Sequence, residues 1–161
     1  MVAELLQLCR ERGLKITLIE SLTGGLLADR FVSVAGASDV FLGGVIAYQD
    51  QLKSYFATVS PSLIEAQTAV DAEVSSQMAA GIRSRIANVM DITPEKIIGI
   101  STTGVAGPEP VGNNKVGTCF VGISLFAGES VYSHQFEGSR QQIREQACDK
   151  AIEALWEQLG Q

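Results

Sequence analysis

The chain has 161 residues, of which 46% are hydrophobic and 19% charged, a composition typical of a globular protein and not of a disordered one. Eighteen acidic against twelve basic residues give a net charge of −6, which argues against nucleic acid as a partner, because nucleic-acid binding needs a basic surface. Three cysteines without CxxC spacing argue against a disulfide framework and a cysteine zinc site. No segment approaches the ~18 apolar residues of a membrane helix, and no signal-peptide core follows Met1. We therefore expect a cytoplasmic protein that does not associate with membranes.

Hydrophobic periodicity and turn residues divide the first half of the chain into alternating helices and strands. Val2, Leu5, Leu6 and Cys9 recur at helical spacing, and the helix that they predict ends near Gly13. The next expected elements are a strand at 15–19, a helix at 26–31, a strand at 41–48 and a helix at 50–57. Because residues 41–48 are almost all apolar, we expect that strand to be buried on both faces of the sheet.

Helix-start signals and a hairpin pattern organise the second half. Ser60-Pro61, Asp71 and Thr93-Pro94 are typical of helix starts. The helix after Asp71 should bury the stripe Val74, Met78, Ile82, Ile86 and Val89. A strand at 97–101, a long loop at 102–115, a hairpin of 116–126 with 131–136, and a final helix capped by Ser139 and Gln142 complete the chain. This alternation predicts an α/β domain with a mixed β-sheet flanked by helices.

A serine lies at the expected turn between a strand and a helix, in residues 20–25 with the sequence ESLTGG. At such a turn a serine can project its hydroxyl, and the following amides and the helix dipole favour a developing oxyanion. This interpretation makes Ser21 a nucleophile. The alternative is that Ser21 or Thr23 only caps the helix, and that Gly24 and Gly25 only fit a tight turn.

A tyrosine and a lysine follow the next expected strand, as Tyr48 and Lys53. His134 is the only histidine, and we expect it to be structural, so an enzyme with this sequence needs another general base. Serine hydrolases without histidine use a lysine, a tyrosine or both, because burial or a neighbouring charge can lower their pKa toward neutrality. The alternative is a surface lysine beside a half-buried core tyrosine.

Two more segments indicate a ligand site. Residues 102–108 (TTGVAGP) place small and hydroxyl side chains after a strand, where the backbone can approach a ligand, although a glycine-rich turn is the alternative. No Gly-Lys-Ser/Thr follows at the spacing of a Walker loop. Arg140 and Arg144 lie one turn apart at the start of the last helix. An anion such as phosphate or carboxylate fits there, and a solvated arginine pair is the alternative.

In combination these segments resemble the CinA C-terminal domain family, which also occurs alone as nicotinamide-nucleotide amidase. The matching residues run in order along almost the whole chain, at 20–28, 43–53, 103–108, 116–118 and 136–144. The resemblance implies an α/β sandwich that self-associates, so we expect a homo-oligomer. It also implies metal-free hydrolysis of the carboxamide of nicotinamide mononucleotide, a pyridine nucleotide, to nicotinate mononucleotide and ammonia, with no cofactor.

The resemblance also implies roles for individual residues. Ser21 would be the nucleophile, with Lys53 and Tyr48 as its activating partners. The oxyanion site and the phosphate site would be formed by Thr23, Gly24, Gly25, Thr103, Gly104, Arg140 and Arg144.

We expect residues 1–161 to form this one domain, without the N-terminal nucleotide-processing domain of full-length CinA proteins. The alternative is a paralogue that binds a nucleotide or a partner protein but has lost turnover. It rests on Leu22, where the family usually has cysteine, and on residues 107–115, which depart from the family's glycine-rich loop. Tight nucleotide binding without release of ammonia would identify such a paralogue.

Overall fold

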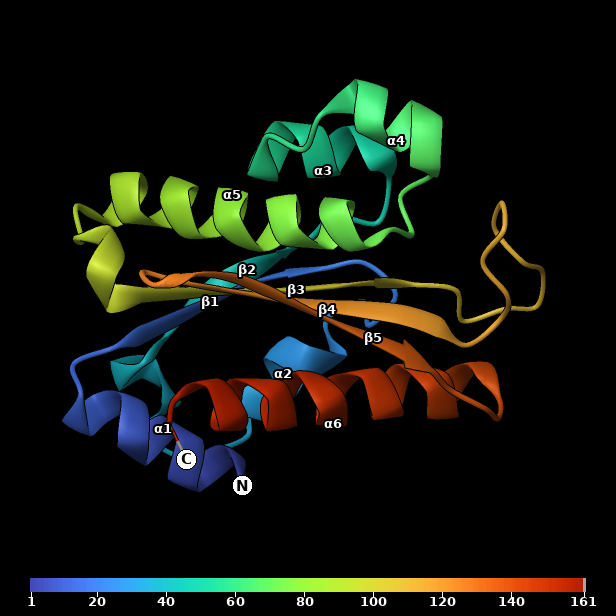
Figure 1. Cartoon of the computed structure of the whole chain (residues 1–161). Coiled ribbons are helices and arrows are strands. Elements are labelled where there is room, and N and C mark those ends of the chain that lie inside the picture. Colours follow the sequence, from blue (N-terminus) through green and yellow to red (C-terminus); the bar gives the residue numbers. More distant parts are fainter. Residues whose placement is uncertain (161) are drawn as a thin grey trace.

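A five-stranded mixed sheet lies between two layers of helices in the computed structural model, which describes residues 1–160 (Figure 1). The strands lie side by side in the order β2 (Phe41–Ile46), β1 (Lys15–Glu20), β3 (Ile97–Gly104), β4 (Thr118–Leu125) and β5 (Gly128–Gln135). Strand β1 is parallel to β2 and β3, whereas β4 is antiparallel to both of its neighbours. The three parallel strands therefore share one carboxyl edge, and the predicted α/β sandwich with a mixed sheet is confirmed.

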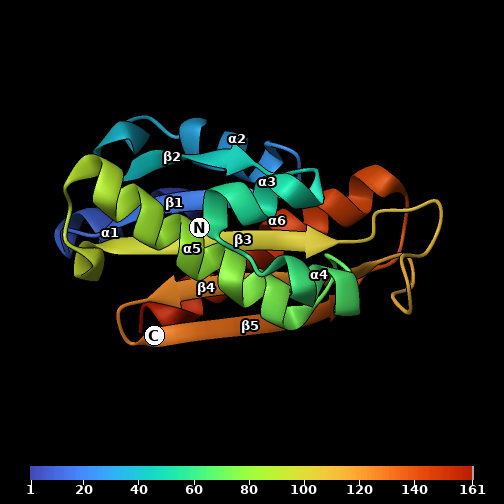
Figure 2. The same ribbon diagram turned by 90° about the horizontal axis from the view of Figure 1, so that it is seen from above.

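The helices divide between the two faces of the sheet (Figures 1 and 2). One layer contains α3 (Asp50–Ala57), α4 (Pro61–Gln67) and α5 (Ala72–Met90). The other contains α1 (Val2–Glu11), α2 (Leu26–Val32) and α6 (Arg140–Gln158), and the short 3₁₀ helices are Ala37–Asp39 and Pro94–Lys96. No helix within residues 1–160 combines the length and the hydrophobicity that a membrane span requires.

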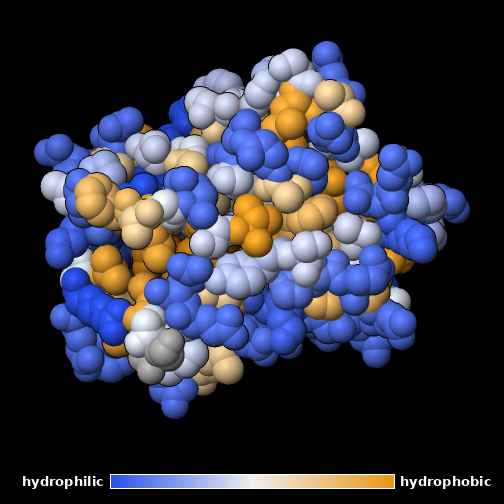
Figure 3. Space-filling view, viewed as in Figure 1, coloured by the Kyte–Doolittle hydropathy of each residue, from blue (hydrophilic) through white to orange (hydrophobic). Residues whose placement is uncertain are grey.

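Each face of the sheet has its own hydrophobic core, because neighbouring strand residues point to opposite faces. On strand β1, Leu18 packs into a cluster with Phe31 of α2 and Leu155 of α6. The next residue, Ile19, packs on the other face with a cluster that includes Met78 of α5. The strand that leads to Ser21 is thus held from both sides, and its end is a rigid place for a functional side chain. Figure 3 shows hydrophilic side chains over most of one face, with hydrophobic groups in the band between the two helical layers.

Three expectations about the elements were wrong. Strand β2 is an edge strand and not a doubly buried one, because only β1 pairs with it, and Ile46 is 51% exposed. The buried stripe of α5 ends before Val89, which is 72% exposed in the last turn of the helix. Strand β3 continues to Gly104, so Thr103 belongs to the strand and the long loop begins at Val105.

Candidate active site

A cavity of about 540 Å³ opens at the carboxyl edge of the parallel strands, the edge where α/β domains bind their ligands. It brings together six of the residues that the sequence singled out, from four separate segments of the chain. These are Ser21, Tyr48, Lys53, Thr103, Gly104 and Arg140. The cavity is also lined by residues that we did not predict, among them Asp50, Ile64, Val70 and Glu109.

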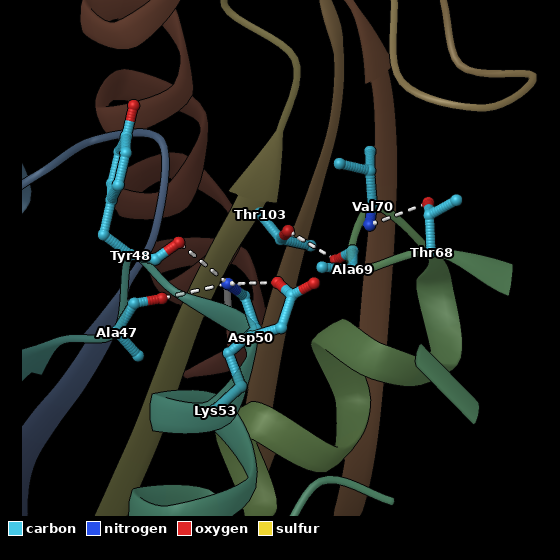
Figure 4. Close-up of polar contacts among 8 residues, drawn as sticks. All are labelled: Ala47, Tyr48, Asp50, Lys53, Thr68, Ala69, Val70 and Thr103. Carbon is cyan, nitrogen blue, oxygen red and sulfur yellow. Dashed lines mark hydrogen bonds and ion pairs between the residues drawn. The ribbon is translucent and has the colours of Figure 1, made fainter. Parts of the chain in front are cut away.

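Lys53 is the most unusual residue of the cavity, because its side chain is only 1% exposed. Its Nζ donates to the backbone oxygens of Ala47 at 3.0 Å and Tyr48 at 3.4 Å, and to Asp50 Oδ1 at 3.3 Å (Figure 4). Burial lowers the pKa of Lys53, because desolvation penalises the charged amine, and the nearby Asp50 carboxylate opposes this in part. The lysine is therefore a buried amine that is more readily neutral than a surface lysine.

The side chain of Tyr48 does not turn toward this amine. Its hydroxyl accepts a hydrogen bond from Arg140 Nη2 at 2.8 Å, and only its backbone oxygen faces Lys53. Figure 4 shows the phenol hydroxyl pointing away from the lysine nitrogen. Tyr48 is 54% exposed, so it lies at the mouth of the cavity and not at its base.

Thr103 connects the sheet to the segment between α4 and α5. Its Oγ1 donates to the Ala69 carbonyl at 2.7 Å, and the side chain is 1% exposed (Figure 4). Asn114 of the long loop donates to the neighbouring Val70 carbonyl, also at 2.7 Å. The segment between α4 and α5, which forms one wall of the cavity, is thus tied both to strand β3 and to the loop that follows it.

The long loop contains a small hairpin of its own. Val111 and Asn114 pair across a two-residue turn that begins with Gly112, whose φ is +57°. A positive φ at the first central residue is typical of type II′ hairpin turns and favours glycine. The residues that depart from the family's loop pattern therefore form an ordered structure, and Val111 still lines the cavity.

The turn after β1 holds Ser21 as predicted, but the helix that follows is already capped. The carboxylate of Glu20 accepts hydrogen bonds from the amides of Gly25, Leu27 and Ala28 at 3.0, 3.1 and 2.9 Å. Three of the amides that follow Ser21 are therefore occupied by a carboxylate that is 2% exposed. Sequence reasoning missed this role of Glu20, although an acidic residue at the end of a strand that leads into a helix start was the available signal.

Four of the expected substrate residues do not line the cavity. Gly24 and Gly25 form the tight turn, with φ values of +59° and +96°. Thr23 is fully buried and shares a hydrogen bond of 2.7 Å with Thr102 between their hydroxyls. Arg144 donates to the carbonyls of Leu22 at 3.0 Å and Thr23 at 2.7 Å. It therefore stabilises the turn that contains Ser21 and does not join Arg140 at the mouth of the cavity.

The structure also bears on metal and histidine chemistry. Across residues 1–160 no group of three or more His, Cys, Asp or Glu side chains is arranged to hold a metal ion. His134 lies on strand β5 and stacks on Phe136 with ring centroids 5.3 Å apart, and it does not line the cavity. The groups of the cavity that can carry chemistry are thus hydroxyls, among them that of Ser21, the buried amine of Lys53, the guanidinium of Arg140 and the carboxylates of Asp50 and Glu109.

Comparisons with known proteins agree on one family. The model of the CinA C-terminal domain matches residues 1–159. A competence-damage inducible protein of Bacillus velezensis is 36% identical over the whole chain, which covers 37% of that relative. A CinA-like protein of Desulfotalea psychrophila is 38% identical over 90% of the chain and 33% of the relative. The chain thus spans about a third of the length of the curated relatives that it matches.

Solved structures match over a larger share of their own length. The competence damage-inducible protein A of Klebsiella pneumoniae superimposes with a TM-score of 0.89 at 26% identity, covering 98% of this chain and 94% of the other. A CinA superfamily protein of Enterobacter cloacae gives a TM-score of 0.87 at 25% identity, covering 99% and 93%. These proteins share the mixed sheet and its flanking helices with this chain.

Proposed function

This chain belongs to the CinA C-terminal domain family, and from that membership and the contents of the cavity we propose that it is a nicotinamide-nucleotide amidase. The reaction is hydrolysis of the carboxamide of nicotinamide mononucleotide to nicotinate mononucleotide and ammonia. The observation that carries the proposal is the buried Lys53, whose pKa is lowered by desolvation, in the same cavity as Ser21.

The proposed chemistry proceeds through an acyl-enzyme. Neutral Lys53 accepts the proton of Ser21 while the serine oxygen attacks the carboxamide carbon. When the carbon–nitrogen bond breaks, the lysine returns that proton to the leaving nitrogen, and ammonia departs. Water then attacks the ester with Lys53 again as the base, which releases nicotinate mononucleotide and restores the serine.

The surroundings of Lys53 suit this cycle. Two of its acceptors are backbone oxygens, which hold the amine in place without adding a charge, and the third is the partly exposed Asp50. The amine can therefore alternate between its neutral and charged forms with only one counter-charge nearby. Apolar side chains such as Ile64 and Val70 line the same cavity and suit the face of a pyridine ring.

The test is release of ammonia from nicotinamide mononucleotide by purified protein in the presence of a chelator. We expect release to persist with chelator and to be lost in Ser21→Ala, whereas Ser33→Ala, an exposed serine on the far side of the sheet, serves as the matched control. Activity of Ser21→Ala equal to that of the control excludes Ser21 as the nucleophile.

One observation favours a second candidate, a module that binds the nucleotide without turnover. Glu20 occupies amides that the first interpretation assigned to the oxyanion, and a hydrolase must then stabilise that charge with other donors. Tight binding of the nucleotide to a folded protein that releases no ammonia would establish this candidate.

A further inference from the structure

Arg140 is the positive charge of the cavity that has no carboxylate partner. Its Nη1 donates to the carbonyl oxygen of Gly107, and its Nη2 donates to the hydroxyl of Tyr48 at 2.8 Å. Among residues 1–160, none of the ion pairs involves Arg140, whereas Lys53 is paired with Asp50. A guanidinium has five N–H donors, so with two in use three remain for a ligand. Among the described residues no carboxylate lies within ion-pair distance of Arg140, although Glu109 also lines the cavity, so the guanidinium is open to an anionic ligand.

The hydroxyl of Tyr48 is the natural second donor at this place. A guanidinium has no acceptor, so the phenol oxygen must be the acceptor in the contact with Arg140, and its own proton is free. No protein acceptor for that proton is found within residues 1–160. Tyr48 and Arg140 lie 92 residues apart along the chain, and both line the cavity. Together they offer an O–H and several N–H donors to one ligand group.

The same contact argues against Tyr48 as the base for Ser21. A general base needs a lone pair directed at the proton that it removes. The phenol oxygen instead accepts from Arg140 and points away from the buried amine, as Figure 4 shows. Its exposure of 54%, against 1% for Lys53, also leaves it in the wetter part of the cavity.

We propose that Tyr48 is a specificity residue that binds the phosphate group of the substrate together with Arg140, and that it takes no part in proton transfer. The identity of the substrate rests on the proposed function, whereas the pairing of the two donors rests on the contacts alone. The start of α6, where Ser139 caps the helix and Arg140 is the first residue, adds a favourable dipole for an anion. The tyrosine then selects the mononucleotide over the riboside that lacks the phosphate.

The kinetic test is Tyr48→Phe, which removes one hydroxyl and keeps the ring. We expect KM for nicotinamide mononucleotide to rise about tenfold, the usual effect of losing one hydrogen bond to a charged group, with kcat changed by less than about threefold. Constants for nicotinamide riboside should stay the same. The matched control is Tyr55→Phe, on the exposed side of α3 and outside the cavity lining, which should change neither constant. A fall in kcat of about a hundredfold or more on both substrates would overturn the proposal, because it would return Tyr48 to proton transfer.

A binding test separates this proposal from the proposed function. In the Ser21→Ala background, calorimetry measures affinity without turnover. Adding Tyr48→Phe should weaken binding of nicotinamide mononucleotide about tenfold and leave binding of the riboside unchanged. Equal weakening of both ligands, or no weakening of either, contradicts the phosphate role. If the wild-type protein releases no ammonia, the amidase proposal fails while this measurement still decides the role of Tyr48.

Discussion

Glu20 stabilises the turn that presents Ser21. Its replacement by glutamine tests how much this carboxylate contributes to the free energy of unfolding. Its two carboxylate oxygens accept three amide hydrogens from the N-cap and the first turn of α2, at 2.9 to 3.1 Å, and the side chain is 2% exposed. Oε2 receives Gly25 and Leu27, and Oε1 receives Ala28. Glutamine keeps one acceptor oxygen but turns an NH₂ group toward the remaining amide, where two donors then face each other.

The expected cost follows from these contacts. A hydrogen bond to a charged group contributes about 1.5–3 kcal/mol, and a buried donor without an acceptor costs about 1–3 kcal/mol. Glu20→Gln loses the charge and leaves at least one amide without a partner, so we expect a loss of about 3 kcal/mol in the free energy of unfolding. For a domain of this size that corresponds to a fall in Tm of roughly 6–12 °C.

Urea denaturation, monitored by circular dichroism, measures this loss. An unchanged m value indicates that the substitution changes stability and not the surface exposed on unfolding. Glu4→Gln is the matched control, because the Glu4 side chain is 71% exposed and is paired with the terminal amine of Met1. We expect that variant to stay within about 0.5 kcal/mol of wild type. A loss below about 1 kcal/mol for Glu20→Gln would refute the reasoning, since it would mean that the three amides find other acceptors.

Two further predictions concern the surroundings of Lys53. Asp50→Asn removes the carboxylate that raises the pKa of the lysine, so the pH at which the proposed amidase activity rises should move lower. An unmoved profile would show that the pair does not set the pKa of the catalytic amine. Gly81→Ala places a Cβ 1.8 Å from the Ala57 carbonyl, and we expect it to separate α3 from α5 and cost about 1–3 kcal/mol in thermal unfolding. Wild-type stability in that variant would contradict the close contact of the two helices.

The parts of the fold that sequence predicted are those with local causes. The capping box at the start of α6 is formed as expected, with Gln142 N donating to Ser139 Oγ at 3.3 Å and Ser139 N donating to the glutamine side chain at 2.8 Å. The positive φ values of Gly24 and Gly25 likewise confirm the tight turn after β1. Caps, turns and helix periodicity depend on residues within a few positions of one another, and so they can be identified without a structure.

The order of the strands could not be predicted in the same way. Residues 41–46 are as apolar as a doubly buried strand, yet β2 lies at the edge of the sheet. Two glycines explain part of the discrepancy, because Gly43 and Gly44 raise the apolar character without giving the strand side chains to bury. A Cβ at Gly44 would lie 2.8 Å from the Leu18 carbonyl, so that glycine instead permits close pairing with β1.

In the candidate site, the directions of side chains likewise could not be predicted from the sequence. The sequence placed Arg140 and Arg144 on one helix face and therefore assigned both to an anion. In the structure the two guanidinium groups turn to different partners, Arg144 to the carbonyls of the Ser21 turn and Arg140 to Tyr48, which lies 92 residues away along the chain. Contacts across that separation depend on the packing of α6 against the sheet, which local patterns do not specify.

Burial connects the fold with the proposed chemistry. A lysine is a better base near neutral pH when its amine is kept from water, and here the amine is buried and donates to the backbone oxygens of the segment just before α3. Helix α3 approaches α5 closely because Gly81 has no side chain. A variant such as Gly81→Ala should therefore raise the pKa of Lys53 by admitting water, besides lowering stability. Its activity should then rise at a higher pH than in wild type, opposite in sign to Asp50→Asn, and a shift in the same direction would refute burial as the cause.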